Sequence, residues 1–212
     1  DGGIPYQTLW TFVSSDGRMA ILSFACTQGW FDKYYSLVSA TSKSFKFYDE
    51  PKATQAQKES FLKLYNDAMD RYRKQEYKKA LDQFISASLL VPEFPEIHAL
   101  IGQTALRLRN FPDGEAAYRK AVELDPGDAA HRFSLGVCLL QQSKYDEAAA
   151  SLEKAVELAP DLEPALTNLG VAYLAKEFPE KARKVLEEAT LTDPESTAAH
   201  YNLGLALEKL EE

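Results

Sequence analysis

Apolar residues recur at helical spacing from residue 61 to the end of the chain, and the whole pattern repeats itself. In residues 129–160, two apolar helical stretches are joined by a short polar turn and followed by a proline. That proline is one of four that stand 34 residues apart: Pro92, Pro126, Pro160 and Pro194. A fixed period of this length is typical of stacked helix pairs.

Small and large residues recur in phase with these prolines. When residue 129 is counted as position 1 of a unit, positions 8, 20 and 27 are small throughout, whereas position 24 is large. Position 8 carries Ala68, Gly102, Gly136, Gly170 and Gly204, and position 24 carries Phe84, Tyr118, Leu152 and Leu186. Because a small side chain lets two helix axes approach, the pattern predicts close helix–helix contact within each unit.

This small–large pattern with its closing proline resembles the tetratricopeptide repeat family over residues 61–212. The resemblance implies a mainly α fold, a right-handed α-solenoid of helix–turn–helix units. The units expected are 61–94, 95–128, 129–162 and 163–196, followed by a final helix over 197–212. The sequence departs from the family pattern at Asp67 and Arg71, which occupy core positions of the first unit, and at Pro179, which replaces an aromatic residue.

Residues 1–50 follow a different pattern. Two segments rich in β-branched and aromatic residues, 6–13 and 18–27, flank an Asp-Gly turn signal and predict a β-hairpin. A helix over 30–42 and a third strand over 44–48 would complete a small β-β-α-β module, with 51–60 as linker and helix start.

This module is similar to the carboxy-terminal end of a domain of the PsbP, Mog1 and DcrB type. A module of this size would be marginally stable alone. We therefore expect it to pack against the first helix of the array and cap it.

The charge distribution argues against nucleic acid as the main partner. Residues 1–60 carry six acidic and six basic residues, so the formal charge of −8 arises in the repeats, with 26 acids against 18 bases. No basic stripe is present to displace counterions from a phosphate backbone.

Composition leaves the cellular compartment open. No apolar run approaches about 18 residues, so we expect no membrane insertion and a soluble chain, cytoplasmic or periplasmic. Cys26 and Cys138 lie in different modules, which favours buried free thiols over a disulfide. The chain begins at Asp1 without a methionine, which we interpret as a processed or excised piece of a longer protein.

No constellation of residues predicts catalysis, a cofactor or a metal site. His98, His131 and His200 belong to different units and cannot converge on one ion, so we expect them to be packing or surface residues. The sequence shows no glycine-rich phosphate loop, no cysteine pair at ligand spacing and no Ser-His-acid set on facing elements. We therefore expect a protein that is not an enzyme.

The resemblance implies a binding surface instead. In the family, the first helices line a concave face, and positions 2, 5, 6, 9, 12 and 13 face a bound peptide. Carried over to this chain, these positions give an apolar and aromatic groove with amides that could bond a peptide backbone. The candidate partner-binding residues are Tyr65, Asn66, Tyr72, Gln103, Arg107, Phe133, Gln141, Asn168, Tyr201 and Asn202.

One family feature is missing from this groove. Members that grip a terminal carboxylate use lysine and arginine at positions 2, 5 and 6, whereas position 2 here carries Leu62, Glu96, Ala130, Pro164 and Ala198. An amphipathic helix or an apolar extended segment therefore fits better than an acidic terminus.

The sequence thus predicts a non-enzymatic scaffold that binds a peptide or helix of another protein. Two alternatives stay open, because a repeat architecture serves many roles. The chain could be an assembly or accessory module of an envelope or membrane-associated complex, or the regulatory repeats of an enzyme whose catalytic domain lies outside it. The identity of the partner and the oligomeric state are also open.

Overall fold

A computed structural model describes residues 7–13, 19–25 and 55–211. The chain divides into two compact units, Asp1–Ala53 and Thr54–Glu212. In the first unit, β1 (Gln7–Val13) and β2 (Met19–Ala25) pair as antiparallel strands, with Trp10 opposite Leu22. These are the two strands that the Asp-Gly turn signal predicts. The predicted helix over 30–42, the third strand over 44–48 and the packing of this module lie outside the described residues.

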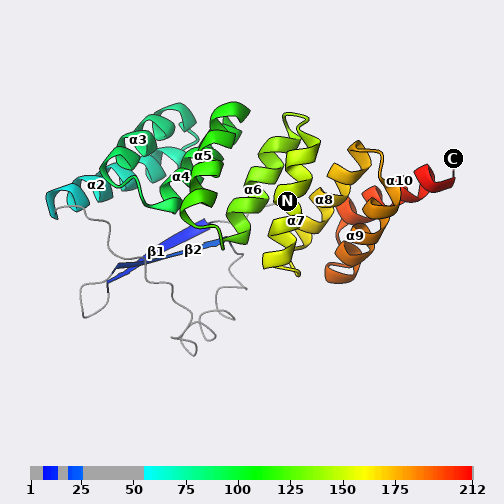
Figure 1. Ribbon diagram of the computed structural model, residues 1–212. Coiled ribbons are helices and arrows are strands. Elements are labelled where there is room, and N and C mark those ends of the chain that lie inside the picture. Colours follow the sequence, from blue (N-terminus) through cyan, green and yellow to red (C-terminus); the bar gives the residue numbers. More distant parts are fainter. Residues whose placement is uncertain (1–6, 14–18, 26–54, 212) are drawn as a thin grey trace. The chain divides into compact units, whose positions relative to one another are not determined.

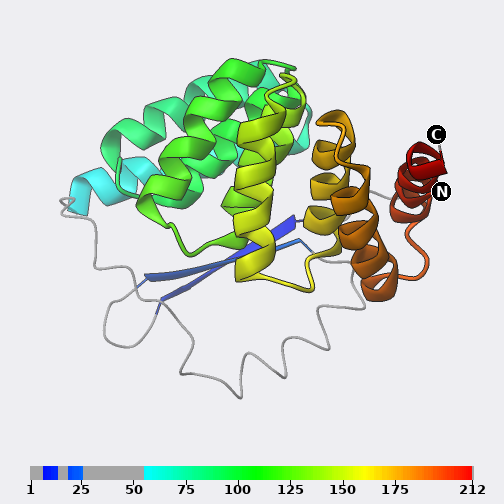
Figure 2. The ribbon, with the colours of Figure 1, turned by 45° about the vertical axis from the view of Figure 1, so that its right-hand side comes forward.

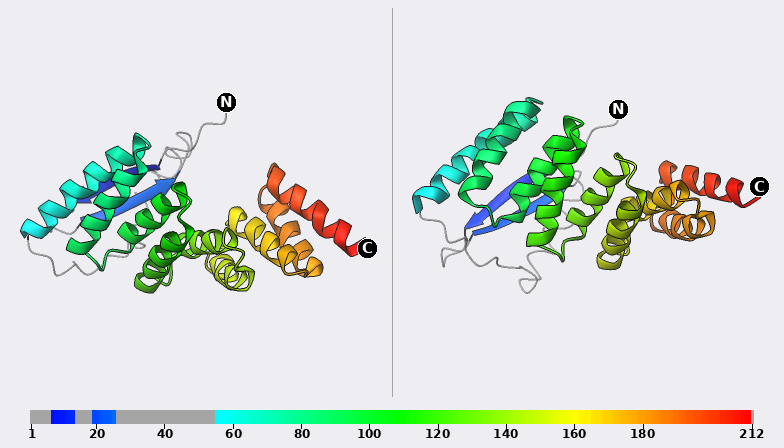
Figure 3. Two further views of the ribbon diagram at one scale, coloured as in Figure 1. Left: turned by 90° about the horizontal axis from the view of Figure 1, so that it is seen from above. Right: turned by 45° about the horizontal axis from the view of Figure 1, so that its top comes forward.

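The described part of the second unit forms nine α-helices, and the mainly α fold class is confirmed for this part of the chain. Helices α2 to α9 form four pairs, each pair packs on the next, and α10 follows alone (Figures 1 and 3). We call α2, α4, α6, α8 and α10 the A helices, and α3, α5, α7 and α9 the B helices. Their bounds are α2 (Gln55–Arg73), α3 (Tyr77–Leu90), α4 (Pro95–Arg107), α5 (Phe111–Leu124), α6 (Ala129–Leu140), α7 (Tyr145–Leu158), α8 (Glu163–Ala175), α9 (Pro179–Thr192) and α10 (Thr197–Glu211).

The turn from each A helix to its B helix repeats with one backbone geometry. Position 15 has a positive φ of 57° to 61° in all four units: Gln75, Arg109, Ser143 and Glu177. In the third unit, the amide of Lys144 donates to the carbonyl of Leu139 at 3.0 Å, and that of Ser143 donates to Leu140 at 2.9 Å. This pair of bonds is a Schellman cap, in which a left-handed residue ends the helix and reverses the chain.

Three of the four closing prolines hold their loop to the A helix that follows. In three units the side chain at position 4 donates a hydrogen bond to the proline carbonyl six residues earlier. The bonds are His98 to Pro92 (2.8 Å), Arg132 to Pro126 (3.1 Å) and His200 to Pro194 (2.9 Å). A carbonyl can only accept, so Nε2 of each of these two histidines carries its proton.

The glycine at position 8 marks the closest approach of the two helices in a unit. A Cβ built on Gly136 would lie only 2.5 Å from Cγ of Leu152, which comes from the B helix and is fully buried. Gly102 meets Tyr118 and Gly170 meets Leu186 in the same way. The small–large pattern in the sequence therefore corresponds to a real contact in which only a hydrogen atom fits beneath the large side chain.

The departures at Asp67 and Arg71 cost the first unit little. Asp67 is exposed and Arg71 is half-buried. Nη1 of Arg71 donates to Oε2 of Glu76 at 3.0 Å, across the turn to α3. Both charged groups therefore avoid burial at positions that are apolar in later units.

Alanine substitutions at two glycines of the same position should have opposite effects on stability. We expect Gly136→Ala to lower the free energy of unfolding by about 1–3 kcal/mol, because the new methyl group overlaps Leu152. We expect Gly204→Ala to raise it by about 0.5–1 kcal/mol, because no atom lies within 4 Å of the added carbon and alanine favours the helix. Urea unfolding followed by circular dichroism measures both changes. Equal changes in one direction would contradict the contact described here.

Candidate partner-binding surface

The A helices form the more crowded layer of the array. They contact one another across units, α4 with α6, α6 with α8 and α8 with α10, whereas no two B helices of the described chain show contact of that extent. In a curved stack the inner layer is the crowded one. The A helices therefore carry the inner face, which is where the candidate residues were expected.

The ten candidate residues differ in exposure. Four are exposed, among them Tyr201 at 66%. The exposed residues are Asn66, Arg107, Gln141 and Tyr201, and the half-buried ones are Tyr72, Gln103, Phe133, Asn168 and Asn202.

Tyr65 belongs to the core instead. Its side chain is 6% exposed, and its ring lies 5.8 Å from that of Phe61 and 6.2 Å from that of Phe84. Burial raises the pKa of its hydroxyl. Tyr65 packs against Phe84, the aromatic residue at position 24 of the first unit. We therefore leave Tyr65 out of the proposed surface.

Two asparagines at position 6 are held in fixed orientations. Nδ2 of Asn168 donates to the carbonyl of Pro164 at 2.7 Å, and Nδ2 of Asn202 donates to that of Ala198 at 2.8 Å. Each bond uses one hydrogen of the amide. The second hydrogen and the Oδ1 acceptor suit the carbonyl and amide of a peptide backbone.

The structure brings two further candidates together across units. Nε of Arg107 donates to the hydroxyl of Tyr72 at 3.3 Å, which links α4 to α2. The Tyr72 ring also meets Tyr77 edge-on, with 5.2 Å between ring centroids. The hydrogen bond to Tyr72 raises the pKa of Arg107 and orients its guanidinium between α4 and α2.

Positive charge is otherwise scarce on this face. Positions 2, 5, 6, 9 and 12 carry no lysine or arginine in any of the five A helices. Basic residues occur only at position 13, as Arg73, Arg107 and Lys209. The surface therefore has no cluster that could neutralise a terminal carboxylate.

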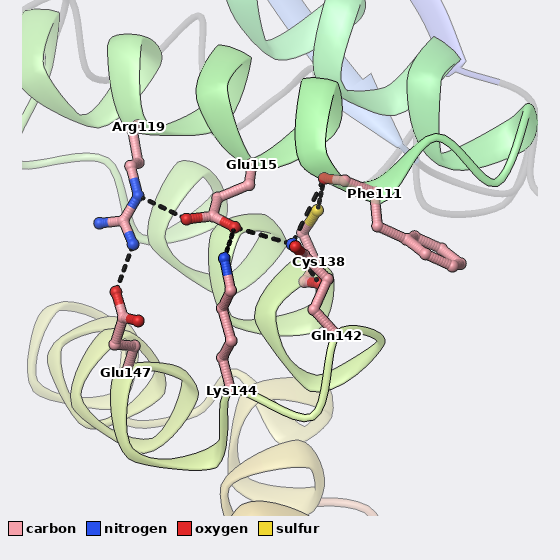
Figure 4. Close-up of polar contacts among 7 residues, drawn as sticks. All are labelled: Phe111, Glu115, Arg119, Cys138, Gln142, Lys144 and Glu147. Atoms are coloured by element: carbon pink, nitrogen blue, oxygen red, sulfur yellow. Dashed lines mark hydrogen bonds and ion pairs between the residues drawn. The ribbon is translucent and has the colours of Figure 1, made fainter.

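A polar network that no sequence pattern indicated joins the second unit to the third (Figure 4). The Glu115 carboxylate on α5 is 12% exposed and accepts three hydrogen bonds. The donors are Arg119 Nε at 2.9 Å, Gln142 Nε2 at 2.8 Å and Lys144 Nζ at 2.7 Å. Arg119 also pairs with Glu147 on α7. Burial alone would raise the pKa of Glu115, but these bonds outweigh it and hold the pKa at about 2.

A cysteine lies beside this network. The Cys138 thiol donates to the carbonyl of Phe111 at 3.1 Å, an acceptor shared with Gln142 at 3.4 Å. Burial raises the pKa of the thiol to about 11, so it stays protonated and unreactive at neutral pH. Cys138 is a buried free thiol, as predicted, whereas Cys26 lies outside the described residues. The network therefore links the second unit to the third.

A shallow depression of about 500 Å³ beside the α6–α7 turn is lined in part by Asp146, Lys176 and Phe178. Nζ of Lys176 already pairs with Asp146 at 2.8 Å and lies 5.2 Å from the centre of the Phe178 ring. Among the described residues, no group of three or more His, Cys, Asp or Glu side chains could hold a metal ion. No helix there is long and apolar enough to cross a membrane.

Stacked helix pairs, a repeated cap and an inner row of A helices define an α-helical repeat protein. Two family models match the chain, each described as tetratricopeptide repeat, over residues 99–163 and 139–207. Through residues 99–207, the chain belongs to the tetratricopeptide repeat family.

Several solved structures share this fold. MamA from Desulfovibrio magneticus RS-1 is 24% identical, with a TM-score of 0.69 over 72% of this chain and 86% of its own. YrrB, described as a TPR protein with an unusual peptide-binding site, is 27% identical, with a TM-score of 0.63 over 81% of this chain and 87% of its own. The first TPR of Spaghetti (RPAP3), bound to the HSP90 peptide SRMEEVD, is 19% identical, with a TM-score of 0.55 over 56% and 94%.

These comparisons concern the repeats. No curated protein sequence matches the chain. The resemblance of residues 1–50 to a PsbP, Mog1 or DcrB domain is not shown by any of these matches.

The Glu115 network should stabilise the array in a pH-dependent way. We expect Glu115→Gln to lower the free energy of unfolding by about 1–2 kcal/mol at pH 7, because two cations then lose a charged partner. A carboxyl with a lowered pKa stabilises the fold above its unfolded pKa, and that effect fades as the pH falls to the folded value. The difference in melting temperature between wild type and variant should therefore shrink between about pH 4.5 and pH 2. A difference that stays constant over this window would contradict the network.

Proposed function

We propose that the array is a non-enzymatic scaffold that binds a segment of another protein along the inner face of its A helices. The observation that carries this proposal is the row of accessible aromatic and amide side chains on successive A helices. Phe133 on α6, Asn168 on α8 and Tyr201 on α10 represent it, one on each helix. Such a row offers apolar contact together with backbone hydrogen bonding.

The surface is preformed, which favours binding. The amides of Asn168 and Asn202 and the guanidinium of Arg107 are already held by hydrogen bonds. Groups that are ordered before binding lose little further conformational entropy, so more of the contact energy appears as affinity.

Two proteins of the same fold support a peptide as the ligand. YrrB is described as having an unusual peptide-binding site, and the RPAP3 repeat was solved with an HSP90 peptide. That HSP90 peptide ends in Glu-Glu-Val-Asp. Because the inner face here has lysine or arginine only at position 13, we propose an apolar extended segment or an amphipathic helix rather than an acidic terminus.

The proposal can be tested by selecting ligands from a random peptide library with the full chain as bait. We expect the selected peptides to be apolar. They should bind the double variant Phe133→Ala plus Asn168→Ala at least about tenfold more weakly than wild type, because this variant lacks one anchor and one backbone contact. Fluorescence anisotropy measures the affinities. Their dependence on salt should be weak, because few charges are involved.

A matched control removes apolar surface elsewhere. Leu89 on α3 and Leu191 on α9 are strongly exposed residues of B helices. Leu89→Ala plus Leu191→Ala should leave peptide affinity unchanged. The proposal would be refuted if the peptides bound the Phe133 and Asn168 variant as tightly as they bind wild type, and the melting curve of the variant showed a retained fold.

A further inference from the structure

Three side chains on the first three A helices have a buried polar atom without a hydrogen-bond partner in the described chain. They are Tyr65 on α2, Glu96 on α4 and His131 on α6, helices that follow one another in the array (Figures 1 and 2). The atoms are Oη of Tyr65, Oε2 of Glu96 and Nδ1 of His131. Tyr65 is 6% exposed and His131 is 7% exposed. A buried polar atom without a hydrogen bond is costly, so these three atoms indicate a site for a polar ligand.

These groups lie within reach of one another's charges and of two aspartates. Burial raises the pKa of Tyr65, and the charge of Glu96 adds to this effect. Burial also raises the pKa of Glu96 to about 7, and the charges of Asp128 and Asp125 act in the same direction. Nδ1 of His131 lies 3.9 Å from Oδ2 of Asp128. We call Tyr65, Glu96, Asp128 and His131 the Glu96 cluster.

Asp128 and His131 present two acceptors at a spacing that one donor can bridge. Oδ1 of Asp128 caps α6 by accepting from the amides of Ala130 at 2.7 Å and His131 at 3.0 Å, whereas Oδ2 is outside this cap. Burial lowers the pKa of His131, so its ring is neutral at pH 7, and Nδ1 is an acceptor when Nε2 carries the proton. The separation of 3.9 Å is too long for a direct hydrogen bond. A nitrogen about 2.8 Å from each atom fits between them.

The cluster suits a ligand that donates several hydrogen bonds and carries positive charge. It contains two carboxylates, and neither Glu96 nor Asp128 pairs with a lysine or arginine of the described chain. No group of three or more metal-binding side chains among the described residues could hold a metal ion. An ammonium group has three donors and no acceptor, and its charge favours the ionised form of Glu96. The side chain of lysine therefore has the chemistry that fits the cluster.

The cluster borders the surface of the proposed function. Glu96 occupies position 2 of α4 and lies seven residues before Gln103, so the two residues share one face of the helix. The side chain of Asp128 is 37% exposed, which leaves the cluster accessible from outside. A segment bound along the inner face can therefore reach the cluster with one long side chain.

We propose that the Glu96 cluster binds the ammonium group of a lysine in the segment that the inner face receives. This inference rests on the proposed function and adds one feature to its ligand, an apolar segment that carries a lysine at a fixed place. Oδ2 of Asp128, Nδ1 of His131 and Oε2 of Glu96 accept the three hydrogen bonds of the ammonium group. Salt screens a partly buried charge pair only weakly, so the salt dependence of binding stays small.

The free chain tests whether a cation of the same polypeptide already binds Glu96. We expect Glu96→Gln to melt at least about 2 °C above wild type at pH 8, because glutamine removes a buried charge. The folded pKa of about 7 lies above the ordinary value of 4.5, so the cost of ionised Glu96 is absent below pH 4.5 and grows as the pH rises through 7. The difference should therefore shrink as the pH falls to 4.5. A variant that melts below wild type at pH 8 would assign Glu96 to a cation of the chain itself and overturn the proposal.

Peptides selected with the full chain as bait at pH 8 test the ligand. We expect them to carry a lysine, and norleucine in its place should weaken binding at least about tenfold, because norleucine keeps the alkyl chain without the ammonium group. The variant Glu96→Gln plus Asp128→Asn should weaken binding of the lysine peptide by a similar factor and leave the norleucine peptide unchanged. Asparagine preserves the cap of α6, so this variant retains its fold. Fluorescence anisotropy measures the affinities.

A matched control removes two acidic charges elsewhere. Asp161 and Asp193 are exposed in the loops before α8 and α10. Asp161→Asn plus Asp193→Asn changes the net charge by the same amount and should bind the lysine peptide like wild type.

Three binding results would overturn the proposal. They are selected peptides with no enrichment in lysine, a norleucine effect that is as large on the Glu96 and Asp128 variant as on wild type, and equal weakening by the control variant. The Phe133→Ala plus Asn168→Ala variant separates the two proposals. Peptides without lysine that lose affinity for this variant would refute the lysine site alone. Lysine peptides that need the Glu96 cluster but bind this variant like wild type would refute the proposed inner-face surface and leave the lysine site.

Discussion

The array depends on the close approach of two helices at position 8 of each unit. A glycine or alanine there accepts the large side chain of position 24, and alanines or glycines at positions 20 and 27 let the B helix lie flat against its partner. Because the same contact recurs every 34 residues, each pair adopts nearly the same geometry. Stacking identical pairs brings the A helices into contact across units and leaves their remaining side chains facing inward.

Different interactions act within a unit and between units. The left-handed residue at position 15 turns each A helix into the B helix of its own unit, whereas in three units the side chain at position 4 binds the proline carbonyl of the preceding loop. Between the second and third units, Glu115 adds a charged link to Lys144. Stability in such an array is the sum of units and interfaces. Helix α10, the last helix of the described chain, packs on both helices of the fourth pair.

The periodic features of the fold could be predicted from the sequence because they depend on residue size at fixed spacing. The sequence pattern indicated the contacts within each unit through the glycines at position 8 and the large residues at position 24. The closing prolines indicated where each unit ends. Features that occur once could not be predicted this way. Tyr65 is buried because Phe84 lies beside it, and Glu115 meets Lys144 across 29 residues with no repeated signal. Gly204 has the same place in the repeat as its covered counterparts, but no atom lies within 4 Å of a Cβ built there.

The central claim is that 34-residue units are interchangeable because each makes the same contacts with its neighbours. Its most direct test removes the second unit, residues 95–128, and compares the product with a chain that lacks residues 95–124, a deletion out of phase with the repeat. Circular dichroism and urea unfolding should show a shorter, cooperatively folded helical array for the in-phase deletion and loss of cooperative folding for the other. Equal stability of the two products, or unfolding of the in-phase product, would contradict this account.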